Sequence, residues 1–243
     1  MAVAAASRGR GPRPRLIAVP HPLTNVSHFA WRTYSKVLLT LQPAQFFQRL
    51  YGLDWYRNVL DDWLTWLSPS AGSRILDAGC SSGDFSASLA QHGYCVTGVD
   101  RSARAIRYAQ RHQVYENLHF VIADALHLPL QQKYHYSLAA SLLNVVDTPN
   151  QLISELARLT AENGVVSCLF PTPAMQWETA KNYIDAYHLQ GFSAVALGLW
   201  ARLAKKLDPS VVMQQFCDAG LIDVRTVSLL EGMVAGVAAR VSS

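Results

Sequence analysis

Three aspartates, Asp77, Asp100 and Asp124, each stand at or directly after the end of a short apolar run. The first lies in the stretch RILDAGCSSGD, where Gly79 and Gly83 follow the acid. Glycines in a turn after a strand let the backbone approach a ligand closely. A carboxylate at the same turn repels a phosphate group and attracts an ammonium or a sulfonium group. These residues therefore predict a site for a positively charged ligand.

These residues are positioned by strands and helices that alternate along the chain. Short apolar runs predict strands at residues 74–78, 94–99, 118–123, 136–140 and 165–170, and amphipathic segments predict helices at 84–92, 102–113 and 149–159. A further helix is expected from Asp208-Pro209 to Gly220, followed by two antiparallel strands around Glu231-Gly232. The pattern is typical of the α/β class, with a doubly wound, mostly parallel seven-stranded sheet whose last strand is antiparallel.

The chain divides into three regions by composition. Residues 1–26 form a basic tail that we expect to be disordered, and residues 27–68 form an N-terminal helical cap with apolar side chains at helical spacing. Residues 69–243 form the α/β domain. Within it, residues 171–207 are inserted between the fifth strand and the last helix, where we expect a lid or substrate-binding insertion.

The composition excludes several classes of protein. Half of the 243 residues are hydrophobic and 16% are charged, which is typical of a compact enzyme and not of a disordered chain. The net charge of +4 is uneven, because the residues before Asp54 include seven Arg or Lys and no acid. The rest of the chain has 14 basic and 17 acidic residues, a net charge of −3. We therefore expect a small-molecule partner and no nucleic acid.

The four cysteines, Cys80, Cys95, Cys168 and Cys217, are scattered without a C-x-x-C pair or a paired histidine. This spacing argues against a disulfide framework and against a zinc site, and no metal is expected. Cys95 and Cys168 fall in predicted strands, where a reduced thiol packs as a small buried hydrophobe. The pattern indicates a reducing compartment, and we expect the cytoplasm.

Two segments leave other locations open. The start, MAVAAASRGRGPRPRL, is rich in arginine and has no following apolar stretch, so we expect no secretory signal, while an organelle-targeting peptide stays an alternative to a disordered tail. The stretch VALGLWARLAKKL, residues 195–207, is apolar with a basic end. It fits a lid helix or a helix that rests on a membrane surface, and its apolar part is too short to span a bilayer.

Residues 73–243 resemble the class I S-adenosylmethionine-dependent methyltransferases, in particular the small-molecule group that includes the quinone-biosynthesis C-methyltransferases. The resemblance is carried by DAGCSSG at the first strand-to-helix turn, by GVD at the end of the second strand and by ADA at the end of the third. It implies a Rossmann-like methyltransferase fold and S-adenosyl-L-methionine as the cofactor. It also implies transfer of a methyl group to a small, aromatic or apolar acceptor by in-line displacement.

The resemblance further implies roles for the residues at matching positions. The first turn would hold the methionine moiety, Asp100 the ribose hydroxyls, and Asp124 the edge of the adenine. Ser141, after the fourth strand, would lie near the transferred methyl group. The whole expected cofactor-binding set is Asp77, Gly79, Cys80, Gly83, Asp100, Arg101, Asp124, Ala125 and Ser141.

The chain departs from the family pattern at three positions. Ser81 stands where the family usually has a third glycine, and His135 stands where an acid usually follows the aromatic residue of the fourth strand. Asn144, in the run LNVVDTP, stands where a histidine is frequent. The resemblance therefore bears on cofactor binding more directly than on the acceptor.

Two aromatic-rich regions are candidates for an acceptor pocket, residues 29–66 and the insertion at 171–207. The expected substrate-binding residues are Asn144, Trp177, Tyr183 and Tyr187. The same aromatic stripes also fit packing of helices on the sheet. His127, His135 and His188 are candidates for a general base by residue type, and the sequence singles out none of them as catalytic.

Two other functions stay open. An NAD(P)-linked oxidoreductase would use a related sheet and would suit Asp100, but Gly79 and Gly83 form G-x-x-x-G, whereas the dinucleotide fingerprint is G-x-G-x-x-G. A non-catalytic methyltransferase-like subunit that binds a partner through its aromatic segments would also fit a sequence that discloses no base.

Overall fold

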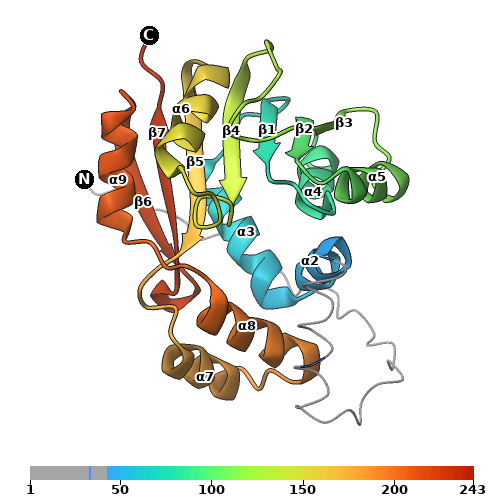
Figure 1. Ribbon diagram of the computed structural model, residues 1–243, viewed down its shortest axis with the longest axis vertical. Helices are drawn as coiled ribbons and strands as arrows, with labels where there is room; N and C mark the ends of the chain where they lie inside the picture. The colour runs from blue at the N-terminus through green and yellow to red at the C-terminus, as the bar shows by residue number, and fades with distance from the viewer. Residues whose placement is uncertain (1–32, 34–42) are drawn as a thin grey trace, which may run out of the picture.

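A computed structural model describes residue 33 and residues 43–243 of the chain. Its centre is a seven-stranded sheet with the strand order β3-β2-β1-β4-β5-β7-β6 (Figure 1). The strands are β1 (Arg74–Ala78), β2 (Cys95–Asp100), β3 (Leu118–Ile122), β4 (Tyr134–Ala140), β5 (Thr160–Pro171), β6 (Ile222–Leu229) and β7 (Val234–Arg240). Neighbouring strands from β3 to β5 pair in parallel, and β7 runs antiparallel to both β5 and β6. The mostly parallel seven-stranded sheet with an antiparallel last strand is confirmed.

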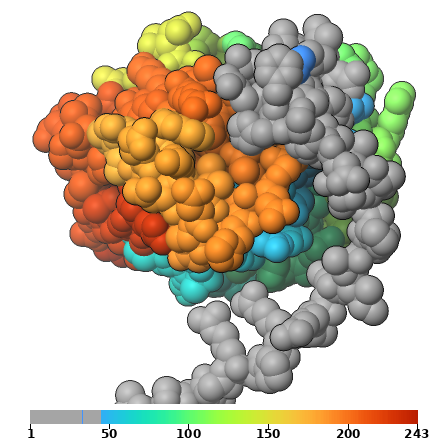
Figure 2. Space-filling view, turned by 90° about the horizontal axis from the view of Figure 1, so that it is seen from below, coloured from blue at the N-terminus to red at the C-terminus, as the bar shows by residue number. Residues whose placement is uncertain are grey.

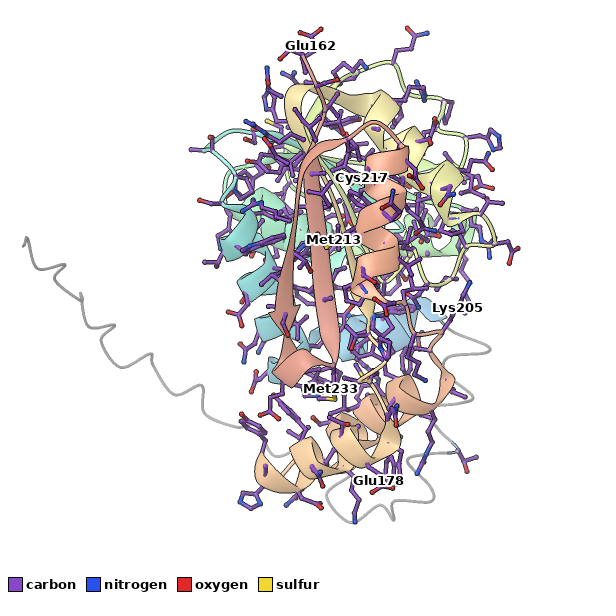
Figure 3. The ribbon with its side chains drawn as sticks, turned by 90° about the vertical axis from the view of Figure 1, so that its left-hand side faces the viewer. Glu162, Glu178, Lys205, Met213, Cys217 and Met233 are labelled. Atoms are coloured by element: carbon purple, nitrogen blue, oxygen red, sulfur yellow. The ribbon has the colours of Figure 1, made fainter. Side chains whose placement is uncertain are left out.

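Helices cover both faces of this sheet. They are α2 (Pro43–Tyr51), α3 (Asp54–Leu67), α4 (Asp84–Gln91), α5 (Ala103–His112), α6 (Pro149–Leu159), α7 (Trp177–Ala186), α8 (Gly191–Leu203) and α9 (Pro209–Asp218), with a 3-10 turn η1 (Leu230–Gly232). Ile75 and Leu76, adjacent in β1, belong to different apolar cores, as the alternation of side chains along a strand requires. The core of Ile75 includes α3 and α4, and that of Leu76 includes α6 and α9. Figure 3 shows α9, with Met213 and Cys217, lying along β6 and β7.

One predicted strand is longer than the sequence indicated. The expected strand at 165–170 begins at Thr160, because Thr160 pairs with Tyr134 at the start of β4. Asn163 lies between the two parts of the strand with a φ of 59°, and the register of β4 and β5 shifts beside it. Asn163 thus marks an irregularity within β5 and not the beginning of the strand.

Helix α3 is fixed on the sheet by one tryptophan. The indole N–H of Trp63 donates to the Ser167 hydroxyl at 3.0 Å, and that hydroxyl donates to the Val237 carbonyl at 2.9 Å. Gly236 makes room for the ring, since a Cβ there would lie 2.9 Å from Cδ1 of Trp63. The buried, hydrogen-bonded indole therefore sets where the carboxyl-terminal half of α3 lies relative to the sheet.

The insertion forms a helical pair at the end of the sheet to which β4 and β5 point (Figure 1). The chain leaves β5 at Pro171 and returns at Leu207, whose N–H donates to the Pro171 carbonyl at 2.9 Å. Seen from below, α7 and α8 form a broad part of the outer surface (Figure 2). Trp200 of α8 packs on Trp55 and Tyr56 of α3, with both pairs of ring centroids 6.0 Å apart. The insertion thus packs on the helical cap.

The apolar part of the stretch 195–207, predicted as a lid or membrane helix, lies in α8, which ends at Leu203. Its residues Val195, Leu197 and Leu199 are buried against the rest of the protein. These three side chains therefore offer no apolar face to a membrane, and the exposed large apolar side chain of the stretch is Leu203 at the end of the helix. Among the helices of residues 43–243, none is long and apolar enough to cross a bilayer.

The cysteines are all free. Cys168 is buried in β5 as expected, and burial raises the pKa of its thiol to about 12. The prediction that Cys95 is buried is wrong, because it occupies the first position of β2, where the side chain is exposed. A strand assignment alone does not say which face or end of the strand is covered.

Candidate active site

A cavity of about 500 Å³ lies at the carboxyl ends of β1 to β4. One side consists of residues that end or follow these strands, and the other side comes from α2 and α3. Among the described residues, the first side includes Asp77, Gly79, Cys80, Asp100, Arg101, Asp124, Ala125 and Ser141. Eight of the nine residues expected to bind the cofactor are therefore brought together, at the edge where open α/β sheets bind ligands.

Asp77 is the most deeply buried acid of this cavity, with 2% of its surface exposed. Its Oδ2 accepts a hydrogen bond of 2.6 Å from the Ser86 hydroxyl, which α4 supplies. Burial and, to a smaller extent, the negative charge of Asp100 raise the pKa of Asp77 to about 6, against the lowering effect of the Ser86 hydrogen bond. The carboxylate is therefore kept charged at neutral pH in a setting that favours a nearby cation.

The turn after β1 approaches β2 through its backbone. Gly79 has a φ of 81°, and its N–H donates to the Val99 carbonyl at 2.7 Å. The Cys80 N–H donates to the same carbonyl at 2.9 Å. Burial and the charges of Asp77 and Asp100 raise the pKa of the Cys80 thiol well above its usual value, so Cys80 stays a neutral wall residue.

Asp100 joins the first and second strand ends. Its Oδ2 accepts from the Ser81 N–H at 3.1 Å, and its Oδ1 accepts from the Ser102 N–H at 2.8 Å. Ser81, which replaces the third glycine of the family pattern, has a φ of 47°. The carboxylate thus helps to hold a serine in a conformation that glycine adopts more readily.

Asp124 and Ser141 complete the row of strand ends. The Asp124 Oδ1 accepts from the Leu126 N–H at 3.0 Å, which closes a local turn after β3. Ser141 has a φ of 54°, and its N–H donates to the Leu169 carbonyl at 2.7 Å. Both residues lie at the cavity because of hydrogen bonds to their own turn or to the next strand.

Gly83 is the expected cofactor residue that does not line the cavity. It has a φ of 78°, and a Cβ at this position would lie 2.6 Å from the Phe120 ring and 2.9 Å from Cβ of Ala109. The glycine lets the start of α4 pack against β3 and α5. The positive φ and the close packing are sufficient reasons for a glycine at position 83, and neither involves a ligand.

The side of the cavity facing the strand ends is mostly aromatic, and none of its residues is among the site residues expected from the sequence. It consists of Phe47, Tyr51, Tyr56 and Leu60 from α2 and α3. Burial raises the pKa values of Tyr51 and Tyr56, so both hydroxyls keep their protons. These residues belong to the aromatic region at 29–66, which the sequence indicates as a candidate acceptor pocket. The structure describes residue 33 and residues 43–66 of that region.

The three aromatic residues expected to bind substrate lie elsewhere. Tyr187 is 55% exposed, stacks on Tyr183 with centroids 4.2 Å apart, and donates to Oε1 of Glu231 at 3.0 Å. Trp177 packs beneath the guanidinium of Arg202, 3.7 Å from the ring centroid. None of the three is among the residues that line the cavity, because α7 packs against α8 and reaches the β6–β7 connection.

Asn144 is 8% exposed, and its Oδ1 has no hydrogen-bond partner in the described part of the chain. It does not line the cavity, although Leu142 and Val145 on either side of it do. The structure therefore places Asn144 behind the wall formed by the loop after β4.

The histidines expected as base candidates do not line the cavity either. His127 contacts Gln151 of α6 through Nε2, and Nδ1 of His135 accepts from the Arg74 N–H at 3.1 Å. His188 is exposed after α7. The described residues also contain no group of three His, Cys, Asp or Glu side chains that could hold a metal ion.

The charges around the cavity have one dominant sign. The described lining residues with charged side chains are Asp77, Asp84, Asp100, Asp124, Asp147 and Arg101. Five carboxylates against one guanidinium attract a positively charged ligand and repel a phosphate. The arrangement fits the cationic ligand that the sequence predicted, with an aromatic surface on the opposite side for a flat or apolar second ligand.

Comparison with known proteins identifies a family. Residues 69–205, more than half of the chain, match a family model described as a methyltransferase domain. Ubiquinone biosynthesis O-methyltransferase from Albidiferax ferrireducens is 31% identical over 110 residues, which cover 43% of this chain and 44% of that protein. The match thus spans less than half the length of the curated relative.

Solved structures agree in fold. Magnesium protoporphyrin IX methyltransferase from Synechocystis PCC 6803, solved with bound SAH, has a TM-score of 0.60 at 19% identity, over 87% of this chain and 100% of that one. The N-methyltransferase NodS from Bradyrhizobium japonicum has a TM-score of 0.57 at 19% identity, over 80% of this chain and 100% of that one. These likenesses extend the match beyond residues 69–205 to most of the sheet and its helices.

Proposed function

The chain belongs to the methyltransferase domain family, and on that premise we propose that it transfers a methyl group from S-adenosylmethionine to a small aromatic or apolar acceptor. One observation carries the proposal: a single cavity gathers Asp77, Asp100 and Asp124 from three strand ends, next to Ser141 from a fourth. Carboxylates in this number fit a donor with a sulfonium charge and two ribose hydroxyls. They fit a dinucleotide less well, because its phosphates would be repelled.

Each aspartate would serve a different part of the donor. Both oxygens of Asp100 accept backbone N–H groups, and each keeps a further lone pair for a ribose hydroxyl. Asp124 binds Leu126 through Oδ1, and its other oxygen would serve the adenine edge. Asp77 lies buried at the first turn, where its charge favours a cation over a neutral ligand.

The donor, when bound, supplies a methyl group that passes to the acceptor's lone pair while the carbon–sulfur bond breaks and its electrons remain on sulfur. The protein's part is to align the acceptor and keep water away from the reacting atoms. Leu142, Val145 and Val146 bring apolar side chains to the cavity beside Ser141. Among the described lining residues, the bases at neutral pH are carboxylates, so an acceptor hydroxyl would lose its proton to one of these or to solvent.

The acceptor would lie against the aromatic side of the cavity. Phe47, Tyr56 and Leu60 present rings and a branched side chain opposite the strand ends, which suits a flat ring. Tyr51 and Tyr56 can donate hydrogen bonds from their protonated hydroxyls to an acceptor oxygen. The match to a ubiquinone biosynthesis O-methyltransferase supports an acceptor of this class.

The test has two stages. Calorimetric titration with S-adenosylhomocysteine and with NADP should show binding of the first and none of the second. Asp100→Ala should then lower the affinity for S-adenosylhomocysteine by at least about tenfold, since hydrogen bonds to a charged acceptor are worth about 1.5 to 3 kcal/mol each. Asp185→Ala, an exposed acid on α7, is the matched control and should bind as the wild type does.

Turnover is the second stage. Phenolic and other small ring acceptors, incubated with S-adenosylmethionine and the full chain, should release S-adenosylhomocysteine only when an acceptor is present. Binding of NADP in place of S-adenosylhomocysteine would favour the oxidoreductase alternative. Tight S-adenosylhomocysteine binding without turnover on any acceptor would favour the non-catalytic subunit.

A further inference from the structure

The connection between β3 and β4 lines the cavity without being a helix or a strand. It runs from residue 123 to residue 133, and Ala123, Asp124, Ala125 and Leu126 at its start belong to the cavity wall. Its first residue is tied to β2 by the Ala123 N–H, which donates to the Asp100 carbonyl at 3.2 Å, and the next backbone bond is local, from the His127 N–H to the Asp124 carbonyl at 3.0 Å. A segment of this kind keeps one conformation only if neighbouring elements bind its polar groups.

Helix α6 binds this segment through two charged side chains. Glu155 accepts from the Leu128 N–H through Oε1 at 2.6 Å. Arg158 donates from Nη2 to the Leu128 carbonyl at 2.9 Å and from Nη1 to the Leu130 carbonyl at 3.4 Å. The spacing of three residues puts both side chains on one face of the helix, where they meet the connection together.

The two side chains also hold each other. Arg158 donates to both carboxylate oxygens of Glu155, each at 2.7 Å. The hydrogen bond from Arg158, followed by the Leu128 N–H and then the charge of Arg158, lowers the pKa of Glu155 against the effect of burial, so the carboxylate stays ionised. Gln151, one turn earlier in α6, adds a donor to the Leu126 carbonyl at 3.4 Å. The connection is therefore held from Leu126 to Leu130 by one helix.

We propose that Glu155 and Arg158 are positioning residues that fix Asp124 and so set the affinity for the adenine end of the donor, although neither side chain lines the cavity. The inference rests on the proposed function, in which Asp124 serves the adenine edge. Only His127 separates Leu126, the last cavity residue of the segment, from Leu128, where Glu155 and Arg158 bind the backbone. A shift of the clamped backbone would therefore be passed to the Asp124 turn.

Arginine is required at this position for a geometric reason. Its planar guanidinium reaches two carbonyls and a carboxylate at once, whereas a lysine ammonium carries the same charge as a compact group without that fork. Arg158→Lys therefore keeps the ion pair with Glu155 and loses part of the hydrogen bonding to the Leu128 and Leu130 carbonyls. Arg158→Met keeps the apolar stem and loses the ion pair as well as these hydrogen bonds.

The experiment uses two ligands that differ only at the adenine edge. S-adenosylhomocysteine and S-inosylhomocysteine, in which an oxygen replaces the 6-amino group, are titrated into the full chain by calorimetry. Arg158→Met should lower the affinity for S-adenosylhomocysteine by at least about tenfold, or about 1.4 kcal/mol. It should lower the affinity for S-inosylhomocysteine less, so that the preference for S-adenosylhomocysteine over S-inosylhomocysteine falls. Arg158→Lys should lie between the wild type and Arg158→Met in this preference.

The control is Arg240→Met, which removes an exposed ion pair with Asp223 on β6 and should change neither affinity. Wild-type S-adenosylhomocysteine affinity in a folded Arg158→Met protein would overturn the inference, as would an equal loss for both ligands. If Arg158→Met does not fold, the affinity ratio of Arg158→Lys decides in the same way. A wild-type protein that binds neither ligand would contradict the proposed function itself.

Discussion

The Ser86 hydroxyl donates a hydrogen bond of 2.6 Å to the buried carboxylate of Asp77. The bond joins α4 to the end of β1 behind the first turn of the cavity. It opposes the effect of burial on Asp77, whose pKa nevertheless rises to about 6. The charge of the cavity therefore depends on a hydroxyl that would not itself touch a ligand.

Replacing Ser86 by alanine should make donor binding depend on pH in the neutral range. Without the hydroxyl, the pKa of Asp77 should rise above about 6, so a larger fraction is protonated at pH 7. The preference for cationic S-adenosylmethionine over neutral S-adenosylhomocysteine should then fall at pH 7 and return at pH 9. Calorimetric titration of both ligands from pH 7 to pH 9 measures the two affinities. Ser70→Ala, an exposed serine, is the control, and an unchanged pH profile in Ser86→Ala would show that Asp77 does not act on the ligand's charge.

Asp77→Asn should stabilise the protein in the absence of ligand. The folded pKa of Asp77, about 6, is higher than the usual value of 3.8, so the folded state binds the proton more tightly than the unfolded state does. The ionised carboxylate therefore costs stability that accumulates as the pH rises from 3.8 to 6 and persists above it. The difference corresponds to roughly 3 kcal/mol.

Urea unfolding at pH 7 and at pH 4 tests this expectation. The gain from Asp77→Asn should be large at pH 7 and nearly absent at pH 4, while donor affinity should fall. Equal stability of the two proteins at pH 7 would mean that burial does not penalise the charge of Asp77. The same scan on Asp185→Asn, on the exposed surface of α7, controls for the loss of one acid.

Gly83→Ala should lower stability and leave donor affinity unchanged. The new Cβ would lie 2.6 Å from the Phe120 ring at a φ of 78°, so both contact and conformation oppose it, at a cost of about 1 to 3 kcal/mol. Chemical unfolding measures the loss, and Phe120→Leu in the same chain should restore part of it. A folded variant of normal stability that binds the donor poorly would return Gly83 to the binding site.

Tyr56→Leu and Tyr187→Leu should differ in turnover. Tyr56 lies in the cavity wall, and its replacement should lower acceptor turnover by about tenfold or more, with little change in S-adenosylhomocysteine affinity. Tyr187 is exposed and bonded to Glu231, so its replacement should leave both unchanged. Steady-state rates with the best acceptor provide the measurement. The reverse result would place the acceptor under α7.

Much of the fold and part of the candidate site could be predicted from the sequence, because local patterns specify them. Apolar runs that end in Asp77, Asp100 and Asp124 indicate successive strands, and parallel pairing brings their carboxyl ends to one edge whatever the surrounding helices do. The turn chemistry of Pro149 and Asp208 likewise sets the starts of α6 and α9 by interactions within a few residues. These features are predictable because the interactions that produce them join residues close together in the sequence.

The tertiary structure decided which aromatic region faces the cavity. The region at 29–66 and the insertion at 171–207 both carry rings at helical spacing, and such a pattern says only that one face is buried. The hydrogen bond from Trp63 to Ser167 fixes α3 on β5, Tyr56 of the same helix lines the cavity, and Trp200 packs on Tyr56 from outside the cavity. These contacts join residues far apart in the chain, and their geometry depends on how the helices pack together.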